Sequence, residues 1–134
     1  MDETDYKILQ ILKADARTPF VNIAKRLSTS EGTVRQRVKR LVDDGIIKQF
    51  TIDTTGGGLK ALIDVRLQTN FDTSEVARKI MRLSGVKVVY EVSGEDDVVA
   101  VADVKDTEEL NELVEAVRRM GVASTKTRLI LKEH

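Results

Sequence analysis

The chain contains no cysteine and no tryptophan, and the only histidine among its 134 residues is His134. The absence of cysteine excludes disulfide bonds, thiolate catalysis and cysteine-ligated zinc. With one histidine, a metal site or a catalytic base of the usual kind has almost no side chains to draw on. We therefore expect no metal, no cofactor and no catalytic residue, so an enzyme is disfavoured.

Long apolar runs are also missing. No stretch approaches the roughly 20 apolar residues of a membrane span, and no basic-then-apolar leader is visible. We expect a cytoplasmic protein without a membrane partner. Apolar residues make up 41% of the chain and charged residues 33%, enough for a packed core and good solubility. The net charge is zero, so overall charge does not indicate a nucleic-acid partner.

One short segment departs from this neutral background. Residues 31–40 hold four basic residues and one acidic residue. Apolar positions recur there at helical spacing, which predicts an amphipathic helix capped by Ser30. The apolar positions of that face are Val34, Val38, Leu41 and Val42. A shorter helix is predicted over residues 20–27. A basic helix behind a short helix is the arrangement that enters a DNA major groove, so double-stranded DNA is the first partner to consider.

Position along the basic helix predicts the role of each side chain. Its first turns face the groove, and arginine and glutamine pair bidentately with base edges. More distant basic residues hold phosphates. The predicted DNA-binding residues are Ser30, Glu31, Thr33, Arg35, Gln36, Lys39, Arg40 and Lys48. Arg37 lies between two apolar positions and is either a DNA contact or half of an internal ion pair. A solvated charged face is the alternative for the whole helix.

The flanking segments complete a winged helix-turn-helix over residues 1–53. A first helix is predicted from Asp2 to Ala14, and residues 46–53 are β-rich and suit a modest wing. The residues predicted to form the buried face of the first helix are Tyr6, Ile8, Leu9 and Leu12. Three consecutive glycines then fall within residues 54–58, which we interpret as a hinge because glycine is costly inside regular elements.

Residues 59–134 alternate between strand and helix periodicity. Strands are predicted at 61–68, 86–92, 98–104 and 125–131, and helices at 73–83 and 106–121. The order βαββαβ predicts an α+β, ferredoxin-like sandwich with both helices on one face of the sheet. Apolar residues also fall on the alternate phase, which predicts dimerisation through the free face. The residues placed on that face are Leu62, Val89 and Ile130.

Several motifs in order and spacing now resemble the leucine-responsive regulator/AsnC (Lrp/AsnC) family of transcription factors. The opening has Asp2-x-x-Asp5-x-x-Ile8-Leu9, and the basic helix has Ser30-x-x-x-Val34-x-x-Arg37-Val38-Lys39-Arg40-Leu41. Gly45-Ile46-Ile47-x-x-Phe50 resembles the family's wing entry, and Gly94-x-x-Asp97 its effector-domain motif. The resemblance implies a homodimer or a larger assembly such as an octamer. It also implies that free amino acids bind between neighbouring effector domains.

The resemblance assigns an effector site that residue patterns alone do not. It implies that Asp97 meets the α-ammonium of an amino acid and that Thr125 and Thr127 lie near its α-carboxylate. The residues of this predicted site are Gly94, Asp97, Thr125, Lys126 and Thr127. Composition alone favours an ordinary turn at 94–97, and simple interface packing is a further alternative. We expect Asp97 and Thr125 to be too far apart in one chain, so that the site needs two chains.

The sequence therefore predicts a sequence-specific DNA-binding regulator that is modulated by a small molecule, an amino acid by resemblance. An effector-independent, architectural DNA-binding protein is the alternative. Some relatives of this fold decarboxylate haem precursors with histidines, and the single terminal histidine disfavours that reading here.

Overall fold

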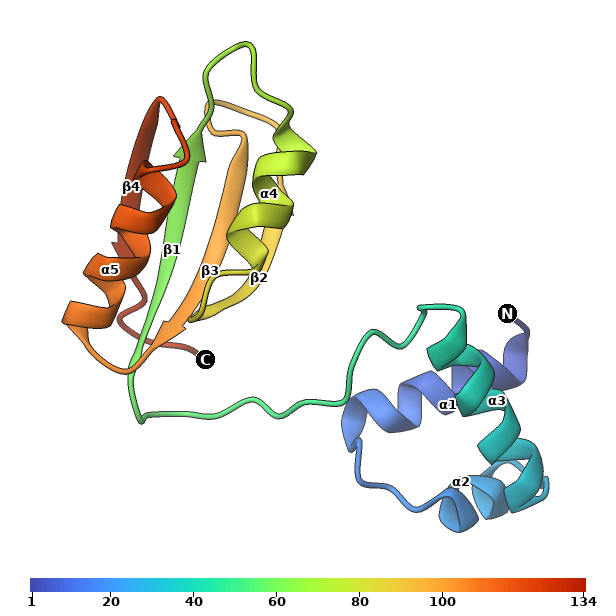
Figure 1. The fold of residues 1–134 in the computed structure, drawn as a ribbon. Helices are drawn as coiled ribbons and strands as arrows, with labels where there is room; N and C mark the ends of the chain where they lie inside the picture. The colour runs from blue at the N-terminus through green and yellow to red at the C-terminus, as the bar shows by residue number, and fades with distance from the viewer. The chain divides into compact units, whose positions relative to one another are not determined.

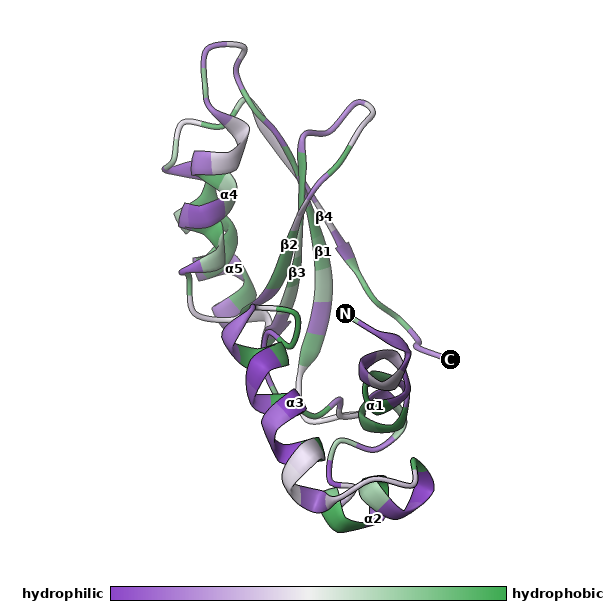
Figure 2. Ribbon diagram, turned by 90° about the vertical axis from the view of Figure 1, so that its right-hand side faces the viewer, coloured by the Kyte–Doolittle hydropathy of each residue, from purple (hydrophilic) through white to green (hydrophobic).

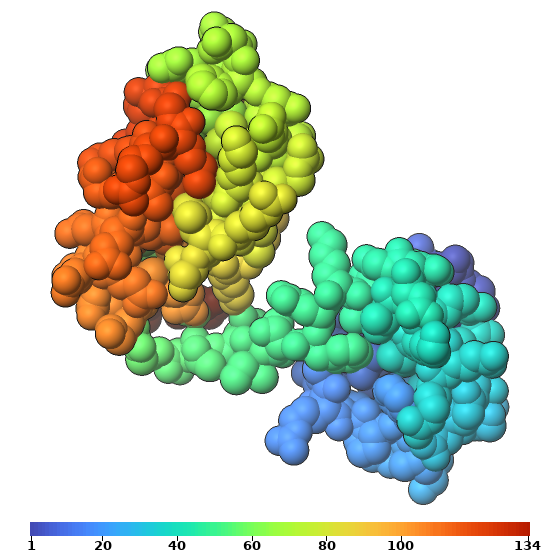
Figure 3. Space-filling model, viewed as in Figure 1, coloured from blue at the N-terminus to red at the C-terminus, as the bar shows by residue number.

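The computed structural model describes all 134 residues and divides them into two compact units, residues 1–53 and 54–134 (Figure 1). Each unit has its own apolar core. Residues 48–58 are exposed throughout, and the space-filling view shows them as a thin length of chain (Figure 3).

The N-terminal unit consists of α1 (Glu3–Ala14), α2 (Phe20–Arg26) and α3 (Glu31–Asp43). The predicted helices are confirmed, with Asp2 capping α1 and Ser30 capping α3. Each helix contributes one apolar stripe to a small shared core. The fully buried large side chains of this unit are Ile8, Ile23, Val34 and Leu41.

Two residues expected in this core are exposed instead. Tyr6 on α1 and Val42 on α3 both lie at the surface. On α1 the buried stripe is rotated, because Asp5 and Ile11 occupy inward positions. A carboxylate such as Asp5 is buried only when it has charged partners, and these partners lie on α3 (see below).

The β-rich segment after α3 forms no strand. No strand is present between Asp43 and Leu59, and Ile46, Phe50 and Ile52 are exposed, Ile52 by 77%. A strand requires a hydrogen-bonded neighbour, and one chain supplies none here. The unit is therefore a helix-turn-helix followed by an extended apolar segment, without a wing strand of its own.

The C-terminal unit is the predicted βαββαβ sandwich. Its elements are β1 (Leu59–Arg66), α4 (Thr73–Met81), β2 (Val86–Glu91), β3 (Val98–Val104), α5 (Thr107–Arg118) and β4 (Ser124–Leu129). The sheet is antiparallel with strand order β2-β3-β1-β4. Both helices cover one face and leave the other open (Figures 1 and 2). The core lies between sheet and helices and includes Ile63, Val65, Ile80, Val98 and Val117.

A β-bulge changes which face the residues of β2 occupy. Val86 pairs with Ala102, but Val88 pairs with Val101, so Lys87 is the extra residue. One extra residue reverses the phase of the strand after it. Val89 therefore packs against the helix-side core rather than on the open face, contrary to the prediction. The open face instead carries Val88 beside Val101.

The glycine-rich connection ends in a position that admits no side chain. A Cβ on Gly58 would lie 2.3 Å from the carbonyl oxygen of Val104, whereas Gly56 and Gly57 have open space and positive φ. Gly58 therefore belongs to the packing of β1 against the end of β3. The other two glycines allow a backbone turn that L-residues disfavour.

Candidate nucleic-acid interface and effector loop

The helix-turn-helix depends on local hydrogen bonds at the start of α3. Ser30 Oγ accepts a bond from the backbone N–H of Thr33 (3.2 Å) and lies 2.8 Å from Thr33 Oγ1. Two predicted DNA-binding residues thus stabilise the first turn of the helix. Ser28, in the preceding turn, has φ +53°, in the left-handed region. Gly45 follows the end of α3 with φ +73°, in the left-handed region.

The face of α3 opposite the core is polar and exposed (Figure 2). Gln36, Lys39 and Arg40 lie there and line a shallow groove, whose other lining residues are Thr33, Arg37, Asp43 and Asp44. Lys48 is exposed on the segment after α3 and lines none of this groove. The structure therefore brings Thr33, Gln36, Lys39 and Arg40 together and leaves Lys48 apart from them.

Arg35 lies on the flank of α3 that faces α2. Its guanidinium carbon is 5.5 Å from the centre of the Phe20 ring, and it forms an ion pair with Glu31 one turn earlier. Stacking on an aromatic ring restricts the guanidinium. Of Arg35 and Gln36, the arginine and glutamine expected to pair with base edges, only Gln36 lines the polar groove.

Every basic side chain of α3 has a carboxylate partner within the chain. Lys39 Nζ is 2.7 Å from Asp43, an ion pair that raises the pKa of Lys39, and Arg35 pairs with Glu31. These two pairs are exposed, so each holds its basic side chain only weakly.

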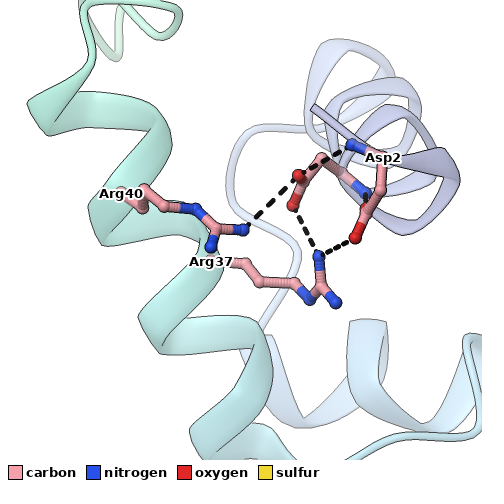
Figure 4. Close-up of polar contacts among 4 residues, drawn as sticks. Asp2, Arg37 and Arg40 are labelled. Atoms are coloured by element: carbon pink, nitrogen blue, oxygen red, sulfur yellow. Dashed lines mark hydrogen bonds and ion pairs between the residues drawn. The ribbon is translucent and has the colours of Figure 1, made fainter.

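The alternative left open for Arg37 is resolved in favour of an internal ion pair (Figure 4). Its Nη1 lies 2.7 Å from Asp2 Oδ2 and 3.0 Å from Asp5 Oδ1, so it connects α3 to the beginning of α1. Arg40 Nη2 approaches the same Asp5 at 3.5 Å. Asp2 and Asp5 also exchange capping hydrogen bonds with each other's backbone N–H. We call these four residues the aspartate–arginine cluster.

The cluster predicts an acid-sensitive contact. The backbone N–H of Asp5 and the Arg37 guanidinium lower the pKa of Asp2 from 3.8 to about 2. Since the folded-state pKa lies below the unfolded value, this contribution to stability is complete above pH 3.8 and is lost as pH falls toward 2. We expect an NMR titration to place the midpoint of the Asp2 carboxyl near 2. A midpoint near 3.8 would show that the contact is absent in solution.

In the second unit, Asp97 holds the ends of two strands. Its Oδ2 accepts a hydrogen bond from the backbone N–H of Leu67 (2.8 Å), and its own N–H donates to Val65 O (2.9 Å). Its carbonyl accepts from the N–H of Val92 (3.0 Å). Only one carboxylate oxygen makes the bond to Leu67. Gly94, in the same loop, has φ +123° and open space around it.

The other predicted effector residues divide between the two faces of the sheet. Thr125 and Thr127 pair with the buried Val65 and Ile63, so they are on the helix side, where Arg118 Nε donates to Thr125 Oγ1 (3.2 Å). Lys126 lies on the open face. The predicted group is therefore not a single constellation within one chain.

Asp97 and Thr125 are separated by less of the sheet than the sequence led us to expect. The loop with Asp97 leads into β3, which is a central strand, and Val65 of β1 pairs with both Val98 and Thr125. Only β1 lies between the two residues, a gap of about two strand spacings, or roughly 10 Å. Both residues lie at the same end of the sheet, and the expectation that the site needs two chains stays a prediction.

Sequence reasoning missed an ion pair on the open face. Arg128 Nε and Nη2 donate to the two carboxylate oxygens of Asp64 at 2.9 and 3.1 Å. Asp64 is only 4% exposed although it interrupts an apolar strand. A buried carboxylate in such a strand was itself the signal that a cationic partner must lie on a neighbouring strand.

Each of the two units matches a known protein family. A model described as winged helix-turn-helix DNA-binding matches residues 1–48, and the Lrp/AsnC ligand binding domain matches residues 60–134. The HTH-type transcriptional regulators LysM of Sulfurisphaera tokodaii and Saccharolobus solfataricus are each 37% identical over 134 residues. These alignments cover 98% of this chain and 96% and 94% of the relatives.

Solved structures of similar proteins match the chain over almost its whole length. MtbAldR matches with a TM-score of 0.89 and 32% identity, covering 100% of this chain and 93% of that one. A transcriptional regulator of Neisseria meningitidis, solved as a complex with L-Met, matches with a TM-score of 0.77 and 28% identity, covering 99% and 91%. The chain belongs to the Lrp/AsnC family. It is a DNA-binding transcriptional regulator with a helix-turn-helix unit and an α+β ligand-binding unit. None of its helices has the length and apolar character needed to cross a bilayer.

Proposed function

We propose that α3 is the recognition helix and that it reads DNA sequence mainly through Gln36, with Lys39 and Arg40 on phosphates. The observation that carries this assignment is the exposed polar groove of α3, whose opposite face is anchored in the core. Ser30 and Thr33 organise the first turn, and Glu31 and Arg35 restrain one another beside it. Lys48 adds a phosphate contact from outside the helix. Selection of binding sites from random DNA, followed by footprinting, tests the assignment.

A free amino acid is the effector that we propose for the second unit. The L-Met complex of the similar Neisseria regulator supports this class of ligand. A site at the end of β1 offers Asp97 for the ammonium group, with Gly94 in the same loop and Thr125 and Thr127 on the neighbouring strand β4. Lys126 faces the other side and would contribute only to a ligand that reaches the open face. The alternative is an effector-independent regulator, which the bond between Asp97 and Leu67 favours because it gives the carboxylate a structural role.

We further propose that the chain forms homodimers, that four such dimers assemble into an octamer, and that residues 54–58 act as a hinge between independently folded units. The open sheet face supports dimerisation, since it presents Leu62, Val88, Val99 and Val101 without a covering layer. The exposed Phe50 and Ile52 add apolar surface on the N-terminal side of the hinge. The relatives are named as transcriptional regulators, which supports a non-enzymatic role.

Residues 59–134 alone are expected to be dimeric at micromolar concentration. Leu62→Lys, at the centre of the open face, should weaken the dimer by about 3 kcal/mol, because each of two copies loses apolar burial. Glu112→Lys, exposed on α5, is the matched control and should leave the dimer intact. Light scattering after size exclusion measures both. A wild-type fragment that remains monomeric would contradict the proposed interface.

A further inference from the structure

We propose that Asp5 determines how much positive charge α3 offers to DNA: it holds Arg37 permanently and Arg40 only until a phosphate replaces it. This inference rests on the DNA interface proposed for α3. It concerns a residue of α1 that does not itself face the groove. Asp5 would act through two arginines and is therefore a positioning residue.

The side chain of Asp5 is only 3% exposed. A buried carboxylate needs a cation at hydrogen-bond distance. Arg37 meets this need at 3.0 Å and is anchored a second time by Asp2 at 2.7 Å. Its side chain is 25% exposed. Arg37 therefore cannot leave Asp5 without a large penalty, and it is withdrawn from the charge available to DNA.

Arg40, one turn further along α3 than Arg37, has one carboxylate partner where Arg37 has two. Arg40 forms its ion pair with Asp5 alone, at 3.5 Å (Figure 4), and its side chain is 58% exposed. Like Arg37, it lines the groove of Gln36 and Lys39. Arg37 continues to neutralise Asp5 when Arg40 departs. Exchange of Arg40 from Asp5 to a phosphate thus leaves no buried charge unpaired, whereas the same movement of Arg37 would.

The consequence is a competition between Asp5 and DNA for Arg40. Loss of the Asp5 charge should remove the competitor and strengthen DNA binding about two- to fivefold, the range of a weak ion pair. The affinity for DNA should also fall more steeply with salt concentration. The slope of log K against log salt should steepen by up to about 0.9, the contribution of one phosphate contact. The reason is that Arg40 no longer has to break an internal ion pair when it binds a phosphate. Loss of Arg40 should make the slope shallower by about the same amount.

The test uses the full chain, a mixed-sequence DNA duplex and fluorescence anisotropy over a range of salt concentrations. The variants are Asp5→Asn, Arg40→Gln and their double mutant. Asp2→Asn is the matched control, since it removes a carboxylate that contacts Arg37 but not Arg40, and asparagine retains the helix cap. We expect Asp5→Asn to bind more tightly, Asp2→Asn to bind as wild type, and the double mutant to bind as Arg40→Gln.

The proposal is overturned if Asp5→Asn leaves affinity and slope unchanged. It is also overturned if Asp5→Asn strengthens binding equally in the Arg40→Gln background, because that result would indicate a general field effect. If Arg40→Gln itself leaves the slope unchanged, the DNA interface of α3 is wrong as well. Should Asp5→Asn not fold, side-chain NMR of the wild type replaces it. DNA should then shift the Arg40 guanidinium signals and not those of Arg37, and the reverse would contradict the proposal.

Discussion

Arg37→Ala is expected to lower the free energy of unfolding of the N-terminal unit by about 3 kcal/mol. The substitution removes the guanidinium that lies 3.0 Å from the buried Asp5 and leaves only Arg40, at 3.5 Å, to balance its charge. It also breaks the bond from α3 to Asp2. A unit of 53 residues has little stability in reserve, so much of it should be unfolded.

Arg35→Ala provides the comparison for this prediction. Arg35 lies on the same helix and also forms an ion pair, but that pair is exposed, so the expected change is within about 0.5–1 kcal/mol. Urea denaturation of residues 1–53, followed by circular dichroism, measures both variants. Equal losses for Arg37→Ala and Arg35→Ala would show that the cluster contributes no more than a surface pair.

Asp97→Asn is expected to weaken amino-acid binding by about 1.5–3 kcal/mol and to remove any ligand-dependent change in assembly. The carboxylate would make a charge-assisted hydrogen bond to the ligand's ammonium group, and asparagine cannot replace that charge. Its amide oxygen can still accept the bond from the N–H of Leu67, so the loop should keep its structure. Calorimetry against a panel of amino acids, with light scattering, measures both effects.

Glu95→Gln is the matched control for Asp97→Asn. Glu95 lies in the same loop and is exposed, and its contact in this structure is made by its backbone carbonyl, which accepts from Arg66. We expect it to bind ligand as wild type does. If wild type binds none of the amino acids, the loop is only a turn and the regulator is effector-independent. If Asp97→Asn binds as tightly as wild type, the site lies elsewhere in the unit.

The order of helices and strands was predictable because local periodicity determines it. The errors occur where periodicity is ambiguous or where a partner is required. In β2, Val86, Val88 and Val89 are all apolar, so either phase suits the pattern and the bulge at Lys87 leaves no trace. Residues 46–53 have the composition of a strand, but no neighbouring strand exists within one chain to pair with them.

For the candidate DNA interface, the sequence predicted which side chains of α3 face away from the core, because that depends on one helix alone. The pattern of α3 indicated its outward face, but not that Arg37 would turn to Asp2 and Asp5, more than 30 residues earlier. The same applies to Arg128 and Asp64. Ion pairs between distant elements depend on the tertiary fold, and a one-dimensional pattern shows only that a charge lacks a local partner.

Whether α3 reads DNA sequence is tested most directly by a comparison of Gln36→Ala with wild type. Both proteins are measured on two duplexes. One duplex carries the site selected from random DNA, and the other has the same composition in scrambled order. Wild type should prefer the selected site, and Gln36→Ala should lose about 1–3 kcal/mol on that site alone, because a base contact carries specificity. Equal losses on both duplexes, or a wild type that does not distinguish them, would contradict the account.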